Sequence, residues 1–350
     1  MKRLIDKLAN ENILSPEEFL YLFENQDTEN TLYLFKKADE VRKKYYGNKV
    51  YIRGLIEFTN YCKNNCYYCG IRCGNKNASR YRLSEEEILM CCKMGYDAGF
   101  RTFVLQGGED PYYTADKICS VVKKIRKLYP DCAITLSAGE FSRKDYEAFF
   151  KAGATRYLLR HETASKDHYE KLHPKEMSWD NRMECLKNLK EIGFQTGCGI
   201  MIGSPYQTYN DIINDLFFIH DFKPHMVGIG PFIPHHDTPF ASMEKGSGNL
   251  TLFTVALVRL ILPNVLLPAT TALGTIMENG REMGILAGCN VCMPNISPSD
   301  AKTKYTLYDN KLITGAESLS GKESLKERLN SIGYEIVTDR GDFKEYPNIF

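Results

Sequence analysis

Residues 49–69 read KVYIRGLIEFTNYCKNNCYYC, an apolar and β-branched run that passes directly into a loop with three cysteines. Such a run predicts a buried β-strand over residues 49–58. Seven further runs of this kind follow, separated by longer stretches of helical pattern: 102–106, 132–137, 155–161, 196–203, 225–232, 264–271 and 289–294. Eight βα units predict an α/β fold, a complete (β/α)8 TIM-type barrel, with an open doubly wound sheet as the alternative.

The chain on either side of these units has a different pattern. Residues 1–48 are helical in pattern, and residues 15–18, SPEE, form a capping box with proline at the first helical position. After residue 298 the sequence becomes polar and charged, with one helical pattern at 320–333 and a strand pattern at 334–339. We therefore expect an N-terminal helical cap over 1–48, a barrel over 49–298, and a C-terminal extension over 299–350 packed on the barrel.

The charge balance and the hydropathy of the chain argue against nucleic acid and membranes as partners. The 45 Lys and Arg residues nearly cancel the 44 Asp and Glu residues, so no overall field favours nucleic acid or an anionic membrane. No apolar run reaches the roughly 18 residues of a membrane span, and the N-terminus MKRLIDKLANEN lacks the apolar stretch of a signal peptide. These features predict a cytoplasmic protein with a small-molecule or protein partner.

Glycine and polar residues gather where the predicted strands end, which in a barrel is the face that carries the chemistry. They are Gly107, Gly108 and Glu109 after the second strand, Ser137 after the third, Arg160 and Glu162 at the fourth, and Thr270 and Thr271 at the seventh. The apolar Met293 ends the eighth strand. Some of them also suit a purely structural interpretation. Gly107 and Gly108 could form a plain turn, and the two-residue spacing of Arg160 and Glu162 suits a structural ion pair on one side of a strand.

Two other polar groups have an ordinary interpretation. Arg182 lies in the amphipathic stretch WDNRMECLKNL, where a solvated helix position is the simpler reading. His235, His236 and Asp237 are adjacent in sequence, and adjacent side chains do not converge easily on a metal. This spacing favours a loop cluster over a metal site.

Four of the twelve cysteines, Cys62, Cys66, Cys69 and Cys73, fall within twelve residues. Most of the other eight read as small buried hydrophobic residues. A zinc site usually takes two separated pairs of ligands, whereas these thiols come from one loop. A CxxxCxxC loop suits a 4Fe-4S cluster with one iron left open. Cys73 is near enough to close the site, but the polar strand ends opposite favour three ligands, with Cys73 as a bystander.

The pattern Cys62-x3-Cys66-x2-Cys69, with Tyr68 before the last cysteine and directly after the first strand of a βα series, resembles the signature of the radical S-adenosylmethionine (SAM) superfamily. The resemblance implies that the three cysteines hold one 4Fe-4S cluster whose open iron chelates SAM. It also implies reductive cleavage of SAM to a 5'-deoxyadenosyl radical. Gly107, Gly108 and Glu109 resemble the GGE-type element of this superfamily, which binds the SAM amino group.

Longer segments are similar to the HydE family of iron–iron hydrogenase maturases, in the branch of biotin synthase and methylornithine synthase: IEFTNYCKNNCYYCGIR, VLQGGEDPYY, RYLLRHETA, VGIGPFIPHHDTP, LLPATTALGTI and NVCMPN. The similarity covers roughly residues 35–300. It implies SAM contacts from Tyr68, Gln106, Gly107, Gly108, Glu109, Ser137, Glu162 and Arg182. It also implies a substrate cavity lined by Arg53, Arg160, Thr270, Thr271 and Met293.

The same resemblance implies a substrate, an electron donor and partners. The adenosyl radical would attack an organometallic iron–carbonyl–cyanide–cysteine precursor during assembly of the hydrogenase H-cluster. The electron would come from a ferredoxin or flavodoxin, and other hydrogenase maturases would be partners. The alternatives are an enzyme like methylornithine synthase or biotin synthase with an organic substrate, and a non-catalytic iron–sulfur protein. Biotin synthase-like chemistry needs further ligands inside the barrel, for which Cys132, Cys198 and Cys292 are the candidates.

Two positions depart from the family pattern. Many members carry a further cysteine cluster near the C-terminus, whereas this chain has no cysteine after Cys292. No second C-terminal cluster is therefore expected. Where the family usually reads GLPGQT after the fifth strand, this chain reads GSPYQT over residues 203–208. Tyr206 is therefore expected to reshape the mouth of the barrel there.

Overall fold

The computed structural model describes residues 1–313 and 321–345, in which strands and helices alternate. The strands are β1 (Lys49–Ile52), β2 (Gly54–Thr59), β3 (Thr102–Gly107), β4 (Ala133–Ser137), β5 (Arg156–Leu158), β6 (Gln195–Ile202), β7 (Met226–Pro231), β8 (Val291–Cys292) and β9 (Glu335–Val337). The helices are α1 (Lys2–Glu11), α2 (Pro16–Glu24), α3 (Thr28–Tyr46), α4 (Glu85–Asp97), α5 (Ala115–Leu128), α6 (Arg143–Ala152), α7 (Lys166–Leu172), α8 (Trp179–Ile192), α9 (Tyr209–Phe222), α10 (Gly248–Ile261), α11 (Thr271–Ile276), α12 (Gly280–Leu286), α13 (Ser299–Lys304) and α14 (Lys322–Ser331).

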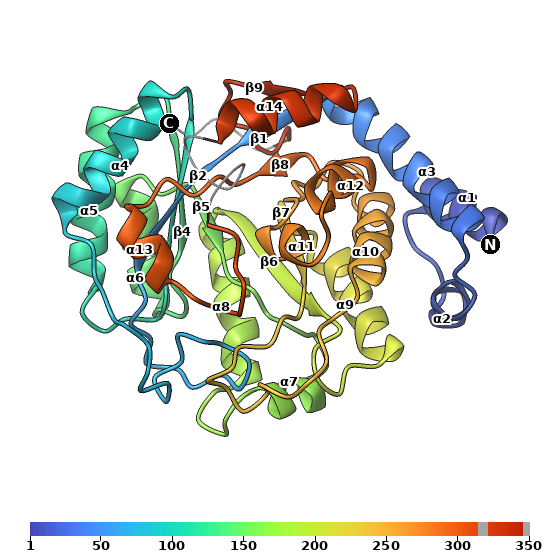
Figure 1. Cartoon of the computed structure of the whole chain (residues 1–350), viewed down its shortest axis with the longest axis horizontal. Helices are drawn as coiled ribbons and strands as arrows, with labels where there is room; N and C mark the ends of the chain where they lie inside the picture. The colour runs from blue at the N-terminus through green and yellow to red at the C-terminus, as the bar shows by residue number, and fades with distance from the viewer. Residues whose placement is uncertain (314–320, 346–350) are drawn as a thin grey trace.

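Strands β2 to β7 form one parallel sheet in which each strand pairs with the next strand in the chain. Most of their residues are buried, as expected for parallel strands covered on both faces. Helices from α4 to α10 surround the strands (Figure 1). Because all six strands run in the same direction, their carboxyl ends meet at one rim, and the loops that leave this rim build the candidate site.

Single backbone bridges continue the pairing from β7 round to β2. The bridged pairs are Met226–Leu266, Pro268–Val291 and Leu55–Asn295. The predicted seventh strand, residues 264–271, is therefore not a continuous strand. Pro268 has no N–H to give to a ladder, and the Thr270 hydroxyl already accepts from Leu273 N to cap α11. The prediction of an α/β barrel-type fold is confirmed, with this seam made of bridges rather than a ladder.

The first predicted strand is divided into two. Residues 49–52 form β1, which pairs with β8 and β9, whereas residues 54–59 form β2, which pairs with β3. Arg53 lies at the break. The fourth predicted strand, 155–161, keeps only the three residues of β5. The local pattern found the positions of these strands but not which neighbours they pair with.

The predicted capping box of the N-terminal region is confirmed, because Ser15 and Glu18 form it at the start of α2. Ser84 and Glu87 form a second capping box at the start of α4. Each box satisfies backbone N–H groups that the first helical turn leaves without partners. One apolar core cluster contains residues from α1 through the strands to Tyr334. The division of the chain at residues 48 and 298 stays a prediction.

The last part of the C-terminal extension, residues 335–343, lies against the amino-terminal ends of the strands. β9 pairs in parallel with β1, and the following residues 339–343, here called the C-terminal plug, lie across the starts of β3, β5 and β6. Asp342 accepts from Arg156 at 2.7 Å and from Gln195 at 2.8 Å, while Arg340 O accepts from Thr102 at 2.7 Å. The plug therefore covers the end of the barrel opposite the rim.

Across the described residues, none of the helices combines the length and the hydropathy needed to cross a bilayer.

Candidate active site at the carboxyl ends of the strands

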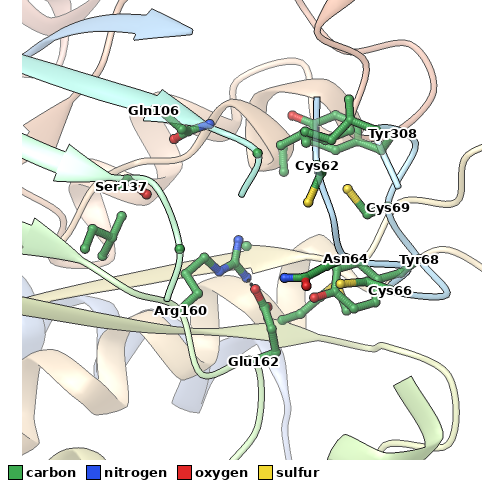
Figure 2. A pocket seen from close by; sticks show the side chains of 18 of the residues that line it. Cys62, Asn64, Cys66, Tyr68, Cys69, Gln106, Ser137, Arg160, Glu162 and Tyr308 are labelled. Carbon is green, nitrogen blue, oxygen red and sulfur yellow. Dashed lines mark ion pairs between the residues drawn. The ribbon is translucent and has the colours of Figure 1, made fainter. Parts of the chain in front are cut away.

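The cysteine loop, residues 60–82, leaves the carboxyl end of β2. Cys62, Cys66 and Cys69 all line one cavity, and Figure 2 shows their sulfur atoms on the same side of it. The loop is held in shape by Arg80, whose guanidinium donates to the backbone carbonyls of four loop residues: Asn60, Ile71, Arg72 and Asn75. No motif points to Arg80, because an arginine that binds loop carbonyls and a solvated arginine look alike in the sequence of a loop.

The three thiols have the chemistry expected of soft-metal ligands. Burial raises the pKa of Cys62 and Cys66, and burial with the nearby Cys62 thiol raises the pKa of Cys69 to about 12. The thiols of Cys62 and Cys69 also raise the pKa of Cys66, as expected for groups that converge. Three converging thiolates need a positive centre to offset their repulsion, and an iron–sulfur cluster supplies one. The donor set therefore fits such a cluster.

Cys73 is placed differently from the other three cysteines of the loop. It is exposed and does not line the cavity. Its backbone N–H donates to Asn64 O at 2.9 Å, which ties the two limbs of the loop together. This position agrees with the interpretation of Cys73 as a bystander.

Glu109 follows the two glycines that end β3, and its carboxylate is buried beside the thiols. A Cβ on Gly108 would lie 2.2 Å from Tyr61 O, so this position requires glycine for the close approach of the two loops. Burial raises the pKa of Glu109. Among the described residues its Oε2 has no hydrogen-bond partner, and Lys63 Nζ is 3.5 Å away. An unsatisfied buried carboxylate oxygen that lines a cavity suits a cationic ligand group such as an ammonium.

Arg182 is buried, so its interpretation as a solvated helix residue is wrong. It lies in α8 but turns inward, because Glu140 Oε1 accepts from its Nε at 2.6 Å and Arg160 O accepts from its Nη1 at 3.0 Å. Its Nη2 lies 3.5 Å from Glu109 Oε1. The helical pattern alone could not show this, since the partner Glu140 comes from a distant loop.

Arg160 and Glu162 form an ion pair of 3.0 Å at the rim, as their spacing suggested, and both line the cavity (Figure 2). Glu162 has a φ of 66°, which is unusual for a residue with a side chain. Its N–H donates to Gly199 O, and Met201 N donates to its carbonyl, so β6 holds it in this conformation. Such strain often marks a site where a side chain must point in a particular direction.

Three more predicted residues line the cavity from neighbouring elements. Gln106 and Ser137 pair in register at the ends of β3 and β4, and Gln106 Nε2 donates to the Tyr305 hydroxyl at 3.4 Å. His173 Nδ1 donates its proton to the Tyr169 carbonyl, so His173 Nε2 carries no proton. Nε2 therefore accepts a hydrogen bond from the Tyr68 hydroxyl at 3.1 Å. His173 was not identified from the sequence.

The cavity has a volume of about 280 Å³, at the low end for small-molecule sites. Every predicted cluster and SAM residue lines it, together with Arg160 and Thr270. Its lining does not include Arg53, Thr271 or Met293, which were expected there. The Arg53 guanidinium faces Met226 Sδ and the plug carbonyl of Gly341, and Met293 packs on the apolar cluster around Tyr51. Thr271 opens α11, one residue past the cavity-lining Thr270.

A segment of the C-terminal extension, residues 305–311, crosses the rim; we call it the strap. Tyr305, Leu307 and Tyr308 line the cavity from this side. Gly70 N, next to Cys69, donates to Leu307 O at 2.8 Å, and Lys311 forms a buried ion pair with Glu57 of β2. The sequence did not reveal the strap, because its polar composition resembles an ordinary tail.

His235 and His236 belong to this strap contact. Asp309 accepts from His236 Nδ1 at 2.7 Å and raises the pKa of His236. His235 Nδ1 accepts from Asp237 N at 3.1 Å, so its proton is on Nε2, the nitrogen that faces Asp309 at 4.0 Å. One ligand atom each of His235, His236 and Asp309 lies within 4.8 Å of the others, a spacing that could also hold a metal ion. The interpretation of His235, His236 and Asp237 as a loop cluster stays a prediction.

The candidate ligands for a cluster deeper in the barrel do not reach the cavity. Cys132, Cys198 and Cys292 are fully buried, and none of them lines it. Cys132 precedes β4 at the far end of the barrel, while Cys198 lies within β6. Cys289 and Cys292 repeat a CxxC spacing at β8, but both are buried outside the cavity.

The chain is similar in sequence to radical SAM proteins of known families. Residues 56–219 match the model of the radical SAM superfamily. The chain is 51% identical over 313 residues to the FeFe-hydrogenase maturase subunit HydE of Thermotoga maritima, covering 89% of this chain and 88% of that protein. It is 31% identical over 341 residues to 3-methylornithine synthase of Methanosarcina acetivorans, covering 96% and 94%.

The fold is similar to that of solved enzymes. The crystal structure of methylornithine synthase (PylB) superposes with a TM-score of 0.84 at 28% identity, covering 95% of this chain and 97% of that one. A crystal structure of the FeFe-hydrogenase maturase HydG has the same fold, with a TM-score of 0.80 at 21% identity. That structure covers 96% of this chain and 75% of the HydG chain.

Proposed function

Because this chain belongs to the HydE family of the radical SAM superfamily and is a radical SAM enzyme, we propose that it acts in iron–iron hydrogenase maturation, on an organometallic iron–carbonyl–cyanide–cysteine precursor of the H-cluster. When bound, the 4Fe-4S cluster and SAM would supply an adenosyl radical after one-electron reduction. The residues of the chain then bind, orient and shield the reacting molecules.

The observation that carries this proposal is the convergence of three cysteines, and not four, on a polar cavity at the strand ends. Cys62, Cys66 and Cys69, which line the cavity, would hold the cluster and would leave one iron without a thiolate ligand. Cys73 is exposed outside it. If four thiolates closed the cluster, the carboxylates and guanidiniums that line this cavity would have no bound ligand to offset the free-energy cost of burying them.

The polar residues around the thiols suit the charged groups of SAM. Glu109 Oε2 would accept a hydrogen bond from the ammonium, and Arg182 would offer its guanidinium to the carboxylate. Glu162 and Ser137 line the cavity beside them and would contact the sugar and the sulfonium region. Tyr68, held by His173, would pack beside the adenine.

The precursor would lie deeper, beside Arg160 and Thr270, which line the cavity. A cationic guanidinium and a hydroxyl suit cyanide and carboxylate groups. The placement of Arg53, Thr271 and Met293 gives them no contact with this cavity as it stands. The strap residues Tyr305, Leu307 and Tyr308 would exclude water from the radical.

The maturase role implies an electron donor, and a ferredoxin or flavodoxin would serve. Other hydrogenase maturases would supply and receive the precursor. We place these steps in the cytoplasm. The cofactor set is one cluster and SAM, without a second C-terminal cluster.

Anaerobic reconstitution tests the proposal. The protein with iron and sulfide restored should give an electron paramagnetic resonance spectrum that changes when SAM is added, and dithionite should drive formation of 5'-deoxyadenosine. Addition of a synthetic iron–carbonyl–cyanide–cysteine complex should increase SAM consumption and give a new paramagnetic product. A spectrum indifferent to SAM would contradict the radical SAM assignment, and SAM cleavage unaffected by the complex would contradict the substrate.

A second candidate function is synthesis of 3-methylornithine, favoured by the TM-score of 0.84 with methylornithine synthase. The higher identity to HydE, 51% against 31%, makes this the weaker candidate. The same reconstituted protein distinguishes them, because formation of 3-methylornithine from an amino-acid substrate would support this second function.

A further inference from the structure

The outer face of the cysteine loop carries a local positive charge on a chain that is nearly neutral. From residue 59 to residue 83 the sequence has five Lys or Arg residues and no Asp or Glu, whereas the whole chain has a net charge of +1. We define the basic face as the side chains on this loop and on the adjoining start of α5 that reach solvent: Tyr61, Lys63, Arg72, Lys76, Arg82, Tyr112 and Lys117.

Three carboxylates around the basic face are engaged within the protein, while Asp116, next to Lys117, is exposed. Asp110 accepts from Arg82 at 2.7 and 2.9 Å, Asp237 accepts from Asn77 at 2.9 Å, and Asp309 pairs with His236. Lys63 forms an ion pair with Glu109 at 3.5 Å, whereas Lys76 and Lys117 are exposed and have no ion pair among the described residues. The charges of Lys76 and Lys117, at the edges of this face, are therefore directed to solvent.

The centre of the basic face is rigid and aromatic. The Arg82 guanidinium lies over the Tyr61 ring at 3.9 Å and over the Tyr112 ring at 4.7 Å, while Lys117 Nζ lies 3.2 Å from the Tyr112 centroid. Both tyrosines are substantially exposed, at 36% and 49%. Tyr and Arg are the residues enriched at protein interfaces, and a side chain held in place loses little entropy when a partner binds.

This face is also next to the cysteines. Tyr61 and Lys63 flank Cys62 in sequence, and Arg72 N donates to Cys69 O at 3.1 Å. The opposite side of the cysteines opens on the cavity, which SAM and substrate would fill and which the strap crosses. A protein that delivers an electron therefore has the shortest approach through the outer face of the loop.

We infer that the basic face is the docking surface for an acidic one-electron carrier protein, such as a reduced flavodoxin. This inference rests on the proposed function, which requires a reductant. In the transfer the carrier loses one electron and the cluster held by the three cysteines gains it, with no bond or proton changed. Opposite charge would speed the encounter and orient the carrier over the loop.

Charge reversal at the two edges of the face provides the test. Lys76→Glu combined with Lys117→Glu changes exposed residues that contact neither the thiols nor the cavity. With reduced flavodoxin as donor, formation of 5'-deoxyadenosine should slow by about tenfold at low salt. With dithionite, which needs no docking surface, the rate should stay within about twofold of wild type. Added salt should slow the flavodoxin reaction of the wild type more than that of the variant.

A matched control reverses the same charge elsewhere. Lys36→Glu with Lys44→Glu lies on exposed positions of α3, which Figure 1 places across the molecule from the cysteine loop. In this control variant, the rates of 5'-deoxyadenosine formation with flavodoxin and with dithionite should both equal those of the wild type. An unchanged flavodoxin rate in the Lys76 and Lys117 variant, or equal slowing with both donors, would overturn the docking surface. Absence of dithionite-driven cleavage in the wild type would instead overturn the proposed function.

Discussion

Arg182 and Glu109 face each other at the rim of the cavity, with Arg182 Nη2 3.5 Å from Glu109 Oε1. Arg182 is held more closely by Glu140, at 2.6 Å. The contact with Glu109 is therefore the weaker of the two, and it leaves Glu109 Oε2 without a hydrogen-bond partner among the described residues. The pair presents one negative and one positive group to the same space, as a zwitterionic amino-acid moiety requires.

Glu109→Gln should weaken SAM binding without affecting the cluster. A hydrogen bond to a charged group contributes about 1.5–3 kcal/mol, so the Kd for SAM should rise by about ten- to a hundredfold. The Kd can be measured by titrating SAM against the paramagnetic signal of the reconstituted protein. Glu86→Gln, at an exposed position of α4, is the control and should leave the Kd unchanged. An unchanged Kd in Glu109→Gln would remove Glu109 from the SAM site.

Cys73→Ala should retain the cluster, whereas Cys69→Ala should lose it. Cys73 is exposed outside the cavity and Cys69 lines it. Iron and sulfide analysis after anaerobic reconstitution should therefore give about four iron atoms per chain for Cys73→Ala, as for wild type. Loss of iron in this variant would show that Cys73 is a ligand and that the site is closed.

Tyr206 should be a source of local strain. It has a φ of 66° in the loop after β6, and its ring lies 6.2 Å from that of Phe240. The left-handed conformation costs a residue with a side chain about 1 kcal/mol relative to glycine. Tyr206→Gly and Tyr206→Ala both remove the ring contact, so comparing them isolates the backbone effect. Urea unfolding should show the glycine variant to be more stable than the alanine variant by about 1 kcal/mol, and the reverse order would contradict the positive φ.

Asp342→Asn should destabilise the protein in a pH-dependent way. Burial alone would raise the pKa of Asp342, but Arg156 outweighs burial and holds the pKa at about 2. Because this lies below the ordinary value of 3.8, the ionised carboxylate stabilises the fold above pH 4, and that contribution is lost as the pH falls toward 2. At pH 7 the variant should be less stable by about 2 kcal/mol.

The difference between Asp342→Asn and wild type should shrink as the pH is lowered from 4 to 2. Chemical denaturation at a series of pH values measures it. A difference for Asp342→Asn that is constant over this pH range would contradict the ion pair with Arg156.

The local sequence pattern was sufficient to predict where the strands lie and which polar residues follow them. Buried positions, helix caps and glycine turns can be recognised from the residues next to them. The local pattern was not sufficient for features set by distant partners. The strand over residues 49–58 divides at Arg53 only because β8 and β9, some 240 residues away or more, pair with its first half. Arg53 itself was assigned to the substrate cavity, but its side chain faces the plug carbonyl of Gly341.

The strap shows the same limit. Tyr305 and Tyr308 line the cavity through backbone contacts such as Gly70 N to Leu307 O, and no periodicity in a polar tail indicates such contacts. Arg182 was recovered only through family resemblance, because its own helix pattern favours solvent. In each case the missing information is which remote segment supplies the partner.

The C-terminal plug has a consequence for the sequence of events in turnover. Among the described residues, 339–343 lie across the starts of β3, β5 and β6, while the cavity is lined by residues of the rim, so we expect reactants to enter from the rim. If the precursor lies beside Arg160, as proposed, it would enter before SAM occupies the rim and would leave after the fragments of SAM. The kinetics should therefore be ordered, with the last reactant to enter giving the first product to leave.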